Sequence, residues 1–439
     1  MEVFFIRALQ LIMALSLLVL VHEFGHFIFS RIFKVRVEKF YLFFDWGFSL
    51  FKWKPKNSET EYGIGWIPLG GYCKISGMID ESMDTEQMKQ PMQPWEFRAK
   101  PAWQRLLIMI GGVMFNFILA MFIYAMIMFT WGESYTDIRK ATYGMEFNEN
   151  AKSLGFMDGD IILKVDDRDV ERYSVDLLRA IADGKTVTVM RGGQEAIVNI
   201  PEDFGLLDMG KEVPFMQFRL PAVIDSILPA SPAATAGLHK GDSVVNIGGE
   251  KIGSWNGLML AMHKMQESGI NSVDITVMRD SLVTLTAQVD STYKLGITPR
   301  TPNYPVEKIT YNFFEAFPAG IAYGWNVLEG YVSDFKYLFS KEGAQSVGMF
   351  GTIGSLFPAM WNWHQFWLMT AMLSLILAVM NILPIPALDG GHVVFLLIEV
   401  ITGRKPSDKV LEYAQMVGMF ILLGLFILAT YNDAMRFIF

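Results

Sequence analysis

Four apolar runs constrain this chain most, because each is long enough to cross a lipid bilayer as a helix. A crossing helix takes about 20 consecutive apolar residues. The runs lie in residues 4–33, 106–131, 366–388 and 413–431, and the second carries no charged residue. The sequence therefore predicts a polytopic α-helical membrane protein with four transmembrane helices and with both termini on the same side.

Composition agrees with this class of protein. Hydrophobic residues make up 52% of the 439 residues, and the mean hydropathy is +0.29, which favours a membrane protein over a soluble enzyme. A formal net charge of -8 argues against nucleic acid as a partner. The single cysteine, Cys73, excludes an internal disulfide, so any polar domain must be stabilised by its own core.

A polar motif, HEFGH at residues 22–26, interrupts the first apolar run. Residues four apart share one face of a helix, so His22 and His26 can bind one Zn²⁺, and Glu23 can serve as the general base that deprotonates a water. Ionisable side chains at membrane depth are costly and are usually functional. The motif therefore predicts a metal site within the membrane, and the alternative is a polar helix-packing cluster without metal.

A third metal ligand is expected near the end of the third run. Catalytic zinc normally has three protein ligands and one open position. Asp389 and His392 both lie in an LDGGH segment, and spacing alone does not choose between them, whereas His364 lies in an aromatic stretch typical of a membrane interface. The preceding residues 381–386, NILPIP, cannot continue a helix, and irregular backbone at that depth is tolerated where it lines a cavity.

The distribution of Lys and Arg predicts the orientation of the chain in the membrane. These residues are concentrated between the first two runs and between the last two, so both connections are expected on the cytoplasmic side. Arg31 follows His26 by about 7.5 Å of helix, which puts the motif in the cytoplasmic half of the bilayer. The long connection of residues 132–365 then lies outside the cytoplasm.

Residues 62–78, YGIGWIPLGGYCKISGM, alternate β-forming residues with glycine and predict a β-hairpin beside the membrane. An open strand edge promotes aggregation unless another chain pairs with it. An extended substrate backbone could be the chain that pairs with this edge. An ordinary surface hairpin is the alternative. Further along, residues 306–337 mix apolar and charged residues, which is typical of helices in the membrane interface, although core-packing helices fit equally well.

The outer connection contains an internal repeat. The pattern G-[FL]-x-x-G-D-x-[IV]-[LV] occurs at residues 155–163 and again at 237–245, and TVMR at 188–191 is repeated at 276–279. This pattern resembles PDZ domains of the bacterial protease-associated type, with a complete lead-in, SPAATAGL, only in the second copy. PDZ domains bind extended chain ends along a strand edge, whereas a steric screen would need no such groove.

Taken together, HEFGH, a GGY segment in the predicted hairpin, two PDZ-like modules and NILPIPALDGGH resemble the site-2 protease family, in its regulator of sigma-E protease branch. The resemblance covers essentially the whole chain. It implies that Glu23 is the catalytic base and that His392 lies just outside the ligand set. The implied zinc ligands are His22, His26 and Asp389, and the implied substrate-binding residues are Asn381, Gly70, Gly71 and Tyr72.

The resemblance further implies a zinc-dependent intramembrane endopeptidase of the bacterial inner membrane, with its PDZ domains on the periplasmic side as a substrate filter. Its partners would be the lipid bilayer and pre-trimmed single-pass membrane proteins, such as anti-sigma factors or signal-peptide remnants. A non-catalytic membrane scaffold, whose PDZ domains capture exported chain ends, is the alternative. Its structural zinc would need a fourth ligand, commonly cysteine, and Cys73 is the only thiol.

The expected fold is thus four transmembrane helices, a membrane-associated β-hairpin and two extracytoplasmic α+β PDZ domains. By residue number we expect a first transmembrane helix with HEFGH at 1–33, a cytoplasmic-side loop with the hairpin at 34–105, a second transmembrane helix at 106–131, PDZ domains at 140–217 and 218–299, interfacial amphipathic helices at 306–360, a third transmembrane helix with LDGGH at 366–395 and a fourth at 413–431.

Overall fold

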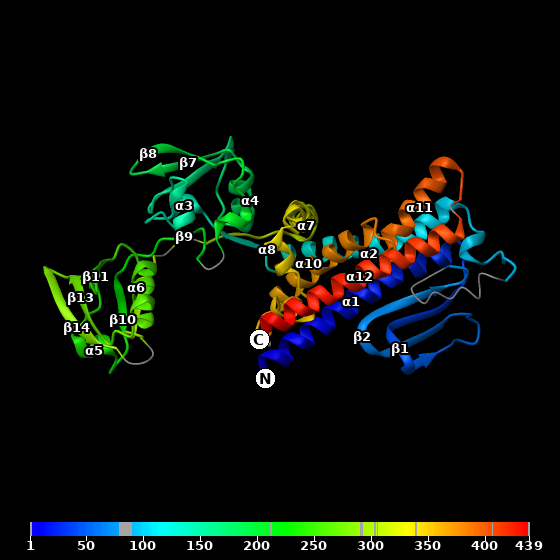
Figure 1. The fold of residues 1–439 in the computed structure, drawn as a ribbon, viewed down its shortest axis with the longest axis horizontal. Coiled ribbons are helices and arrows are strands. Elements are labelled where there is room, and N and C mark those ends of the chain that lie inside the picture. The colour runs from blue at the N-terminus through cyan, green and yellow to red at the C-terminus, as the bar shows by residue number, and fades with distance from the viewer. Residues whose placement is uncertain are drawn as a thin grey trace. The chain divides into compact units, whose positions relative to one another are not determined.

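The chain divides into two compact units, seen in a computed structural model that describes residues 2–78, 90–210, 213–289, 293–302, 304, 306–338, 340–405 and 407–437 (Figure 1). Unit 1 comprises Met1–Glu133 and Thr310–Phe439, and unit 2 is the intervening segment Ser134–Ile309.

Unit 1 is mainly helical. Within the described residues, four helices are long and apolar enough to cross a membrane, which confirms the four predicted runs. Its elements are α1 (Glu2–Ile32), β1 (Val37–Trp53), β2 (Glu61–Ile75), the 3-10 turn η2 (Phe97–Ala99), α2 (Ala102–Thr130), α7 (Phe313–Leu338), α8 (Lys341–Ser346), α9 (Phe350–Ser355), α10 (Trp363–Ile382), α11 (Asp389–Thr402) and α12 (Asp408–Phe437).

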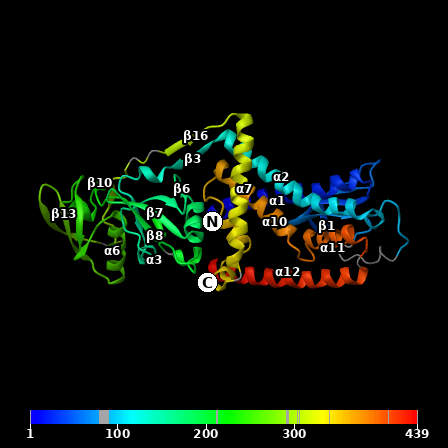
Figure 2. The same cartoon turned by 90° about the horizontal axis from the view of Figure 1, so that it is seen from above.

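Helix α2 is the central element of unit 1, since α1, α7, α10 and α11 all pack against it. Figure 2 shows α7 running across α2. Glycine permits this crossing, because a Cβ atom on Gly320 would lie 2.3 Å from the backbone nitrogen of Ala125. Helix α7 therefore packs closely on α2 along one face. The helical region does not begin at residue 306 as predicted, because Val306–Ile309 forms strand β16.

The segment predicted as one third transmembrane helix, residues 366–395, is divided between two helices. Helix α10 ends at Ile382 and α11 begins at Asp389, which opens its first turn. Pro384 and Pro386 lie between them, and proline lacks the N–H that a continuous helix needs. The LDGGH motif therefore lies at a helix start rather than within a span.

The predicted hairpin is present but is built differently. Residues 62–78 do not pair with themselves; instead β2 pairs with β1, a segment whose sequence pattern had not indicated a strand. Tyr41 lies opposite Tyr72 on one side and opposite Gly63 on the other, so the two halves of β2 flank the first half of β1. A Cβ atom on Gly63 would lie 2.2 Å from the Tyr41 ring, which explains glycine at this position. The half of β2 that follows Gly70 consequently forms an outer edge of this sheet.

Unit 2 contains two modules with the same strand order. The four-stranded sheets have the orders β6-β5-β7-β8 and β12-β11-β13-β14, and each module adds a two-stranded sheet, β4-β9 or β10-β15. The first module contains η3 (Ile138–Lys140), β4 (Met145–Phe147), α3 (Glu149–Ser153), β5 (Ile161–Val165), β6 (Arg168–Asp169), α4 (Val175–Asp183), β7 (Thr186–Arg191), β8 (Gln194–Asn199), η4 (Leu206–Met209) and β9 (Met216–Phe218). The second contains β10 (Ile224–Ile227), α5 (Pro232–Ala236), β11 (Ser243–Ile247), β12 (Glu250–Lys251), α6 (Trp255–Glu267), β13 (Ser272–Met278), β14 (Leu282–Gln288) and β15 (Ile297–Pro299).

Each module has its own apolar core, as expected of chain segments without disulfides. The repeated sequence pattern supplies equivalent core residues, such as Ile162 in the first module and Val244 in the second. Strands β3 (Glu133–Thr136) and β16 (Val306–Ile309) pair with each other, so the segment between them begins and ends at neighbouring strands.

Candidate active site

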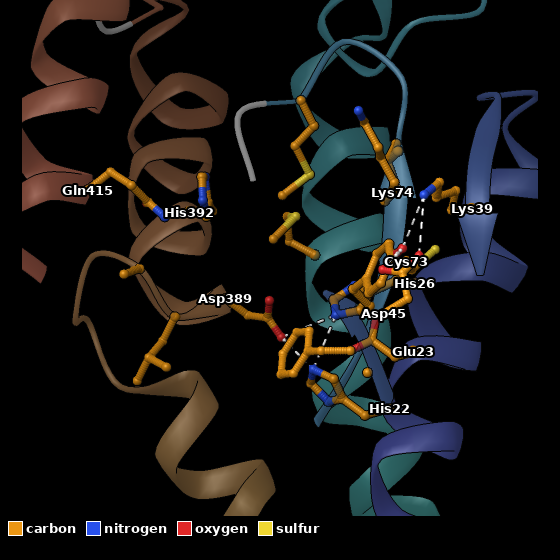
Figure 3. Close-up of a pocket in the computed structure, with 18 of the residues that line it drawn as sticks. His22, Glu23, His26, Lys39, Asp45, Cys73, Lys74, Asp389, His392 and Gln415 are labelled. Carbon is orange, nitrogen blue, oxygen red and sulfur yellow. Dashed lines mark hydrogen bonds and ion pairs between the residues drawn. The ribbon is translucent and has the colours of Figure 1, made fainter. Parts of the chain in front are cut away.

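Two histidines and one aspartate bring their ligand atoms together at one point of unit 1. His22 and His26 lie one helical turn apart on α1, and their Nε2 atoms are 3.3 Å apart. The Asp389 Oδ2 atom, from the start of α11, lies 3.2 Å from His22 Nε2 and 3.3 Å from His26 Nε2. Figure 3 shows the three side chains directed toward one another.

This donor set fits a zinc ion. Ligand atoms of a tetrahedral Zn²⁺ with bonds of about 2.05 Å are separated by about 3.3 Å, close to the three distances observed. Moreover, the Asp389 Oδ2 atom is buried and makes no hydrogen bond to the described residues. A buried carboxylate oxygen without a donor is costly, and coordination of a cation would compensate for it. Within the described residues, no fourth His, Cys, Asp or Glu joins this group.

The break between α10 and α11 brings Asp389 to the histidines. Ala387 adopts a positive φ of 80°, and the loop turns so tightly that a Cβ atom on Gly390 would lie 2.2 Å from the Leu383 carbonyl oxygen. Gly391 is equally confined, at 2.6 Å from the Pro386 Cα atom. The two glycines of LDGGH are thus required by the loop. His392 lines the adjoining cavity but does not belong to the group of three ligand atoms.

Glycines of α1 and α2 allow the two helices to pack closely around the histidines. A Cβ atom on Gly25 would lie 2.2 Å from the Gly111 carbonyl oxygen, so α1 and α2 touch through their backbones. A Cβ atom on Gly112 would lie 2.4 Å from His26 Nε2. Larger residues at these positions would displace either the helices or the imidazoles.

Glu23 lies beside the histidines without joining their group. Glu23 and Cys73 of β2 line the same cavity. Figure 3 shows Glu23 between α1 and the strand that carries Cys73. A carboxylate in this position can accept a proton from a water molecule held near the histidines.

A cavity of about 680 Å³ adjoins the three ligand residues. One wall is the edge of β2, including Gly71 and Tyr72, and the opposite wall includes His392 of α11 and Gln415 of α12. The cavity therefore has an extended strand edge on one side and helices on the other. Gly70, which was also predicted to bind substrate, precedes this stretch of β2.

A polar cluster on the hairpin wall was not anticipated from the sequence. The Tyr72 hydroxyl donates to Asp45 Oδ1 at 2.9 Å, and the Lys39 ammonium lies 3.6 Å from Asp45 Oδ2. Burial and the neighbouring Asp45 carboxylate raise the pKa of Tyr72 far above its ordinary value, so this phenol remains a neutral donor. Tyr72 lies 27 residues after Asp45, and no local motif indicates that they meet.

Two asparagines contact His22. The Asn381 Nδ2 atom lies 3.4 Å from His22 Nε2, and the Asn116 Nδ2 atom lies 3.4 Å from His22 Nδ1. Asn381 was predicted as a substrate contact, whereas Asn116 was overlooked. The available signal was that Asn116 is the only amide side chain in residues 106–131.

Comparison with known proteins identifies the family. The model of Peptidase family M50 matches residues 10–425. The chain belongs to Peptidase family M50, the site-2 protease family. Its relatives include the "Regulator of sigma-E protease RseP" of Escherichia coli strain K12, which is 27% identical over 97% of both chains. "Metalloprotease MmpA" of Caulobacter vibrioides is 26% identical over 99% of this chain and 96% of its own length.

A Vibrio cholerae relative, 27% identical over 97% of both chains, bears the name "Putative zinc metalloprotease". Family membership and the four apolar helices together make this M50 protein a multi-pass membrane metalloprotease.

Proposed function

We propose that this M50 protein cleaves peptide bonds inside the membrane, with a zinc ion held by His22, His26 and Asp389. The observation that carries the proposal is the convergence of three ligand atoms beside a cavity bordered by the outer edge of β2. The buried Asp389 oxygen has the two histidine nitrogens as neighbours but no hydrogen bond, which also supports a cation at this point. The donor set also leaves a position open, as a catalytic site requires.

Zinc, when bound, supplies a Lewis acid that polarises a substrate carbonyl and makes a nearby water more acidic. Glu23, which lines the same cavity as the histidines, accepts the proton of the attacking water. The edge of β2 around Gly70, Gly71 and Tyr72 binds the substrate as an added strand, which keeps its backbone extended. The Asn381 amide, which lies 3.4 Å from His22 Nε2, would donate to the substrate backbone.

The substrates we propose are single-pass membrane proteins that an earlier cut has shortened, including anti-sigma factors and signal-peptide remnants. The name of the Escherichia coli relative refers to a sigma-E pathway, which supports this class of substrate. The basic connections between spans support a bacterial inner-membrane location with residues 34–105 in the cytoplasm. The segment between β3 and β16 then lies on the periplasmic side.

The two modules of unit 2 are proposed to be PDZ domains that exclude untrimmed substrates. Support comes from their identical strand order and from the repeated glycine-aspartate turn. A scaffold with a structural metal site is less well supported, because no cysteine lies in the group formed by the described ligand residues.

The test compares metal content and cleavage in purified full-length variants. Glu23→Gln should keep zinc but lower cleavage by about 100- to 10,000-fold, because the amide cannot accept the proton. His22→Ala, His26→Ala and Asp389→Ala should lose both, and a chelator should abolish cleavage by the unmodified protein. His392→Ala is the matched control and should retain zinc. Retention of zinc by Asp389→Ala together with its loss in His392→Ala would refute the ligand assignment.

A further inference from the structure

The two histidines turn the same ring atom toward Asp389. Both Nε2 atoms face its Oδ2 atom, so both Nδ1 atoms face away. His26 Nδ1 lies 2.9 Å from the backbone carbonyl oxygen of Ile108 on α2. A carbonyl oxygen can only accept, so the proton of neutral His26 is on Nδ1, and its Nε2 presents a lone pair to the site.

His22 requires the same arrangement if its Nε2 is to bind a cation, so its Nδ1 must carry a proton and donate it. The group that faces this nitrogen, at 3.4 Å, is the side-chain amide of Asn116, which is fully buried. As placed, the amide turns Nδ2 toward Nδ1, and its Oδ1 atom has no hydrogen-bond partner among the described residues. Two donors would then face each other while an acceptor remained unused.

Rotating the Asn116 amide by half a turn corrects this mismatch. The oxygen and nitrogen of an amide have nearly the same shape, so their placement follows from the hydrogen-bond network. After rotation, Oδ1 accepts the Nδ1 proton of His22. This hydrogen bond fixes the His22 ring in the orientation and tautomer that leave Nε2 free for metal.

The backbone of α2 holds Asn116 in this position. Ile108, Gly112 and Asn116 are four residues apart and so share the helix face that meets the histidines. Gly112 allows the histidine rings to lie close to α2. The Ser374 hydroxyl of α10 donates to the backbone carbonyl oxygen of Asn116 at 2.7 Å. One face of α2 therefore supplies an acceptor for each histidine.

We propose that Asn116 is a positioning residue of the metal site, whose side-chain oxygen accepts the Nδ1 proton of His22. The proposal rests on the proposed zinc ligands, and it adds a residue that acts on zinc through His22. Groups that orient a metal-bound histidine typically change metal affinity by about 10- to 100-fold when removed. The same loss is expected here.

The experiment measures the zinc dissociation constant of full-length protein in detergent by competition with a chromophoric chelator, in a Glu23→Gln background that prevents cleavage. Asn116→Leu should weaken zinc binding by about 10- to 100-fold. Asn116→Asp keeps an acceptor of the same size and should bind zinc nearly as well as the parent. Thermal unfolding of the metal-free proteins shows that both variants are folded.

Gln10→Leu is the matched control. Gln10 is also a fully buried amide on a membrane-spanning helix, but it bonds to the Pro358 carbonyl oxygen at 3.0 Å, away from the site. The zinc affinity of the Gln10→Leu protein should equal that of the parent. Unchanged affinity in Asn116→Leu, or equal weakening in Asn116→Leu and Asn116→Asp, would overturn the proposal.

A measurement on the parent covers the case in which Asn116→Leu does not fold. In zinc-loaded protein labelled with ¹⁵N-histidine, His22 should show a proton on Nδ1 and metal on Nε2. Metal on His22 Nδ1 would also overturn the proposal. If the parent itself bound no zinc, the proposed metal site would fail, which is a different result.

Discussion

Asp242 and Arg279 show how single residues of the repeat determine local structure. Asp242 is 1% exposed and accepts hydrogen bonds from Arg279 Nε at 2.7 Å and Nη2 at 2.6 Å. Its Oδ2 atom also accepts from the His239 N–H, which closes the turn before β11. Asp160 and Arg191 form the same pair in the first module, at 2.8 and 2.7 Å. The repeated glycine-aspartate and Met-Arg segments are therefore two halves of one interaction.

This pair predicts a pH-dependent stability of the second module. Hydrogen bonds from Arg279 lower the pKa of Asp242 below its ordinary value of 3.8, although burial opposes the shift. A lowered carboxyl pKa stabilises the fold at pH values above 3.8, and this stabilisation is lost as the pH falls through the lower folded-state value. Arg279→Met should therefore lower the free energy of unfolding of this module at neutral pH, and lower it by less in acid.

Hydrogen exchange of the β11 amides in the full-length protein, at neutral and acidic pH, measures this effect. Arg191→Met is the matched control and should act only on β5 of the first module. An equal loss of protection at both pH values would show that Arg279 stabilises by packing instead of by its charge.

At the scale of elements, the edge of β2 and the break between α10 and α11 border the cavity beside the three ligand residues. Cys73 lies on this edge and is the only cysteine of the chain, so it provides a native probe of substrate pairing. Side chains of a strand alternate between two faces, so every second residue of a paired substrate lies on the Cys73 face.

We expect alternate positions of a single-pass substrate to form disulfides with Cys73. Single cysteines are placed at successive substrate positions, the Glu23→Gln protein traps the complex, and oxidative cross-linking is scored. Yields should rise and fall with a period of two, and Cys73→Ser should abolish them. A period between three and four would mean that the substrate remains helical, which would contradict strand addition.

At the scale of the whole molecule, unit 2 is an insertion between two segments of unit 1, and its ends are the paired strands β3 and β16. The candidate active-site residues belong to unit 1, which has apolar clusters of its own. The modules can therefore be removed without deleting a catalytic group.

Replacing residues 137–305 by a short flexible linker should preserve cleavage of short, trimmed substrates and newly permit cleavage of untrimmed ones, because the proposed filter is absent. Gly241→Val is a milder variant: Gly241 has a φ of +94°, which a valine adopts only with strain, so the second module alone is disturbed. Both substrate lengths are compared in parallel. Equal loss of both activities would indicate a stabilising role for the modules, and continued rejection of the long substrate would exclude the filter.

Local patterns in the sequence were sufficient for much of this protein. The apolar runs predicted the four long helices, and HEFGH placed two histidines on one helix face, because both signals depend only on residues a few positions apart. The internal repeat likewise predicted two similar modules, and the two modules have the same strand order. The strand β1 was missed because its sequence, VEKFYLFFDWGFSLFKW, has no clear alternation of polar and apolar residues.

What the sequence by itself determined, then, is the four long apolar helices and the residue types that HEFGH and LDGGH supply. Only the tertiary structure decided that Asp389 rather than His392 joins the histidines, that β2 is held by β1, and that Asn116 faces His22. These outcomes depend on contacts between distant parts of the chain, as for His22 and Asn381, which are 359 residues apart. Such contacts are set by how closely helices approach, and backbone glycines on α1, α2 and the LDGGH loop determine that approach.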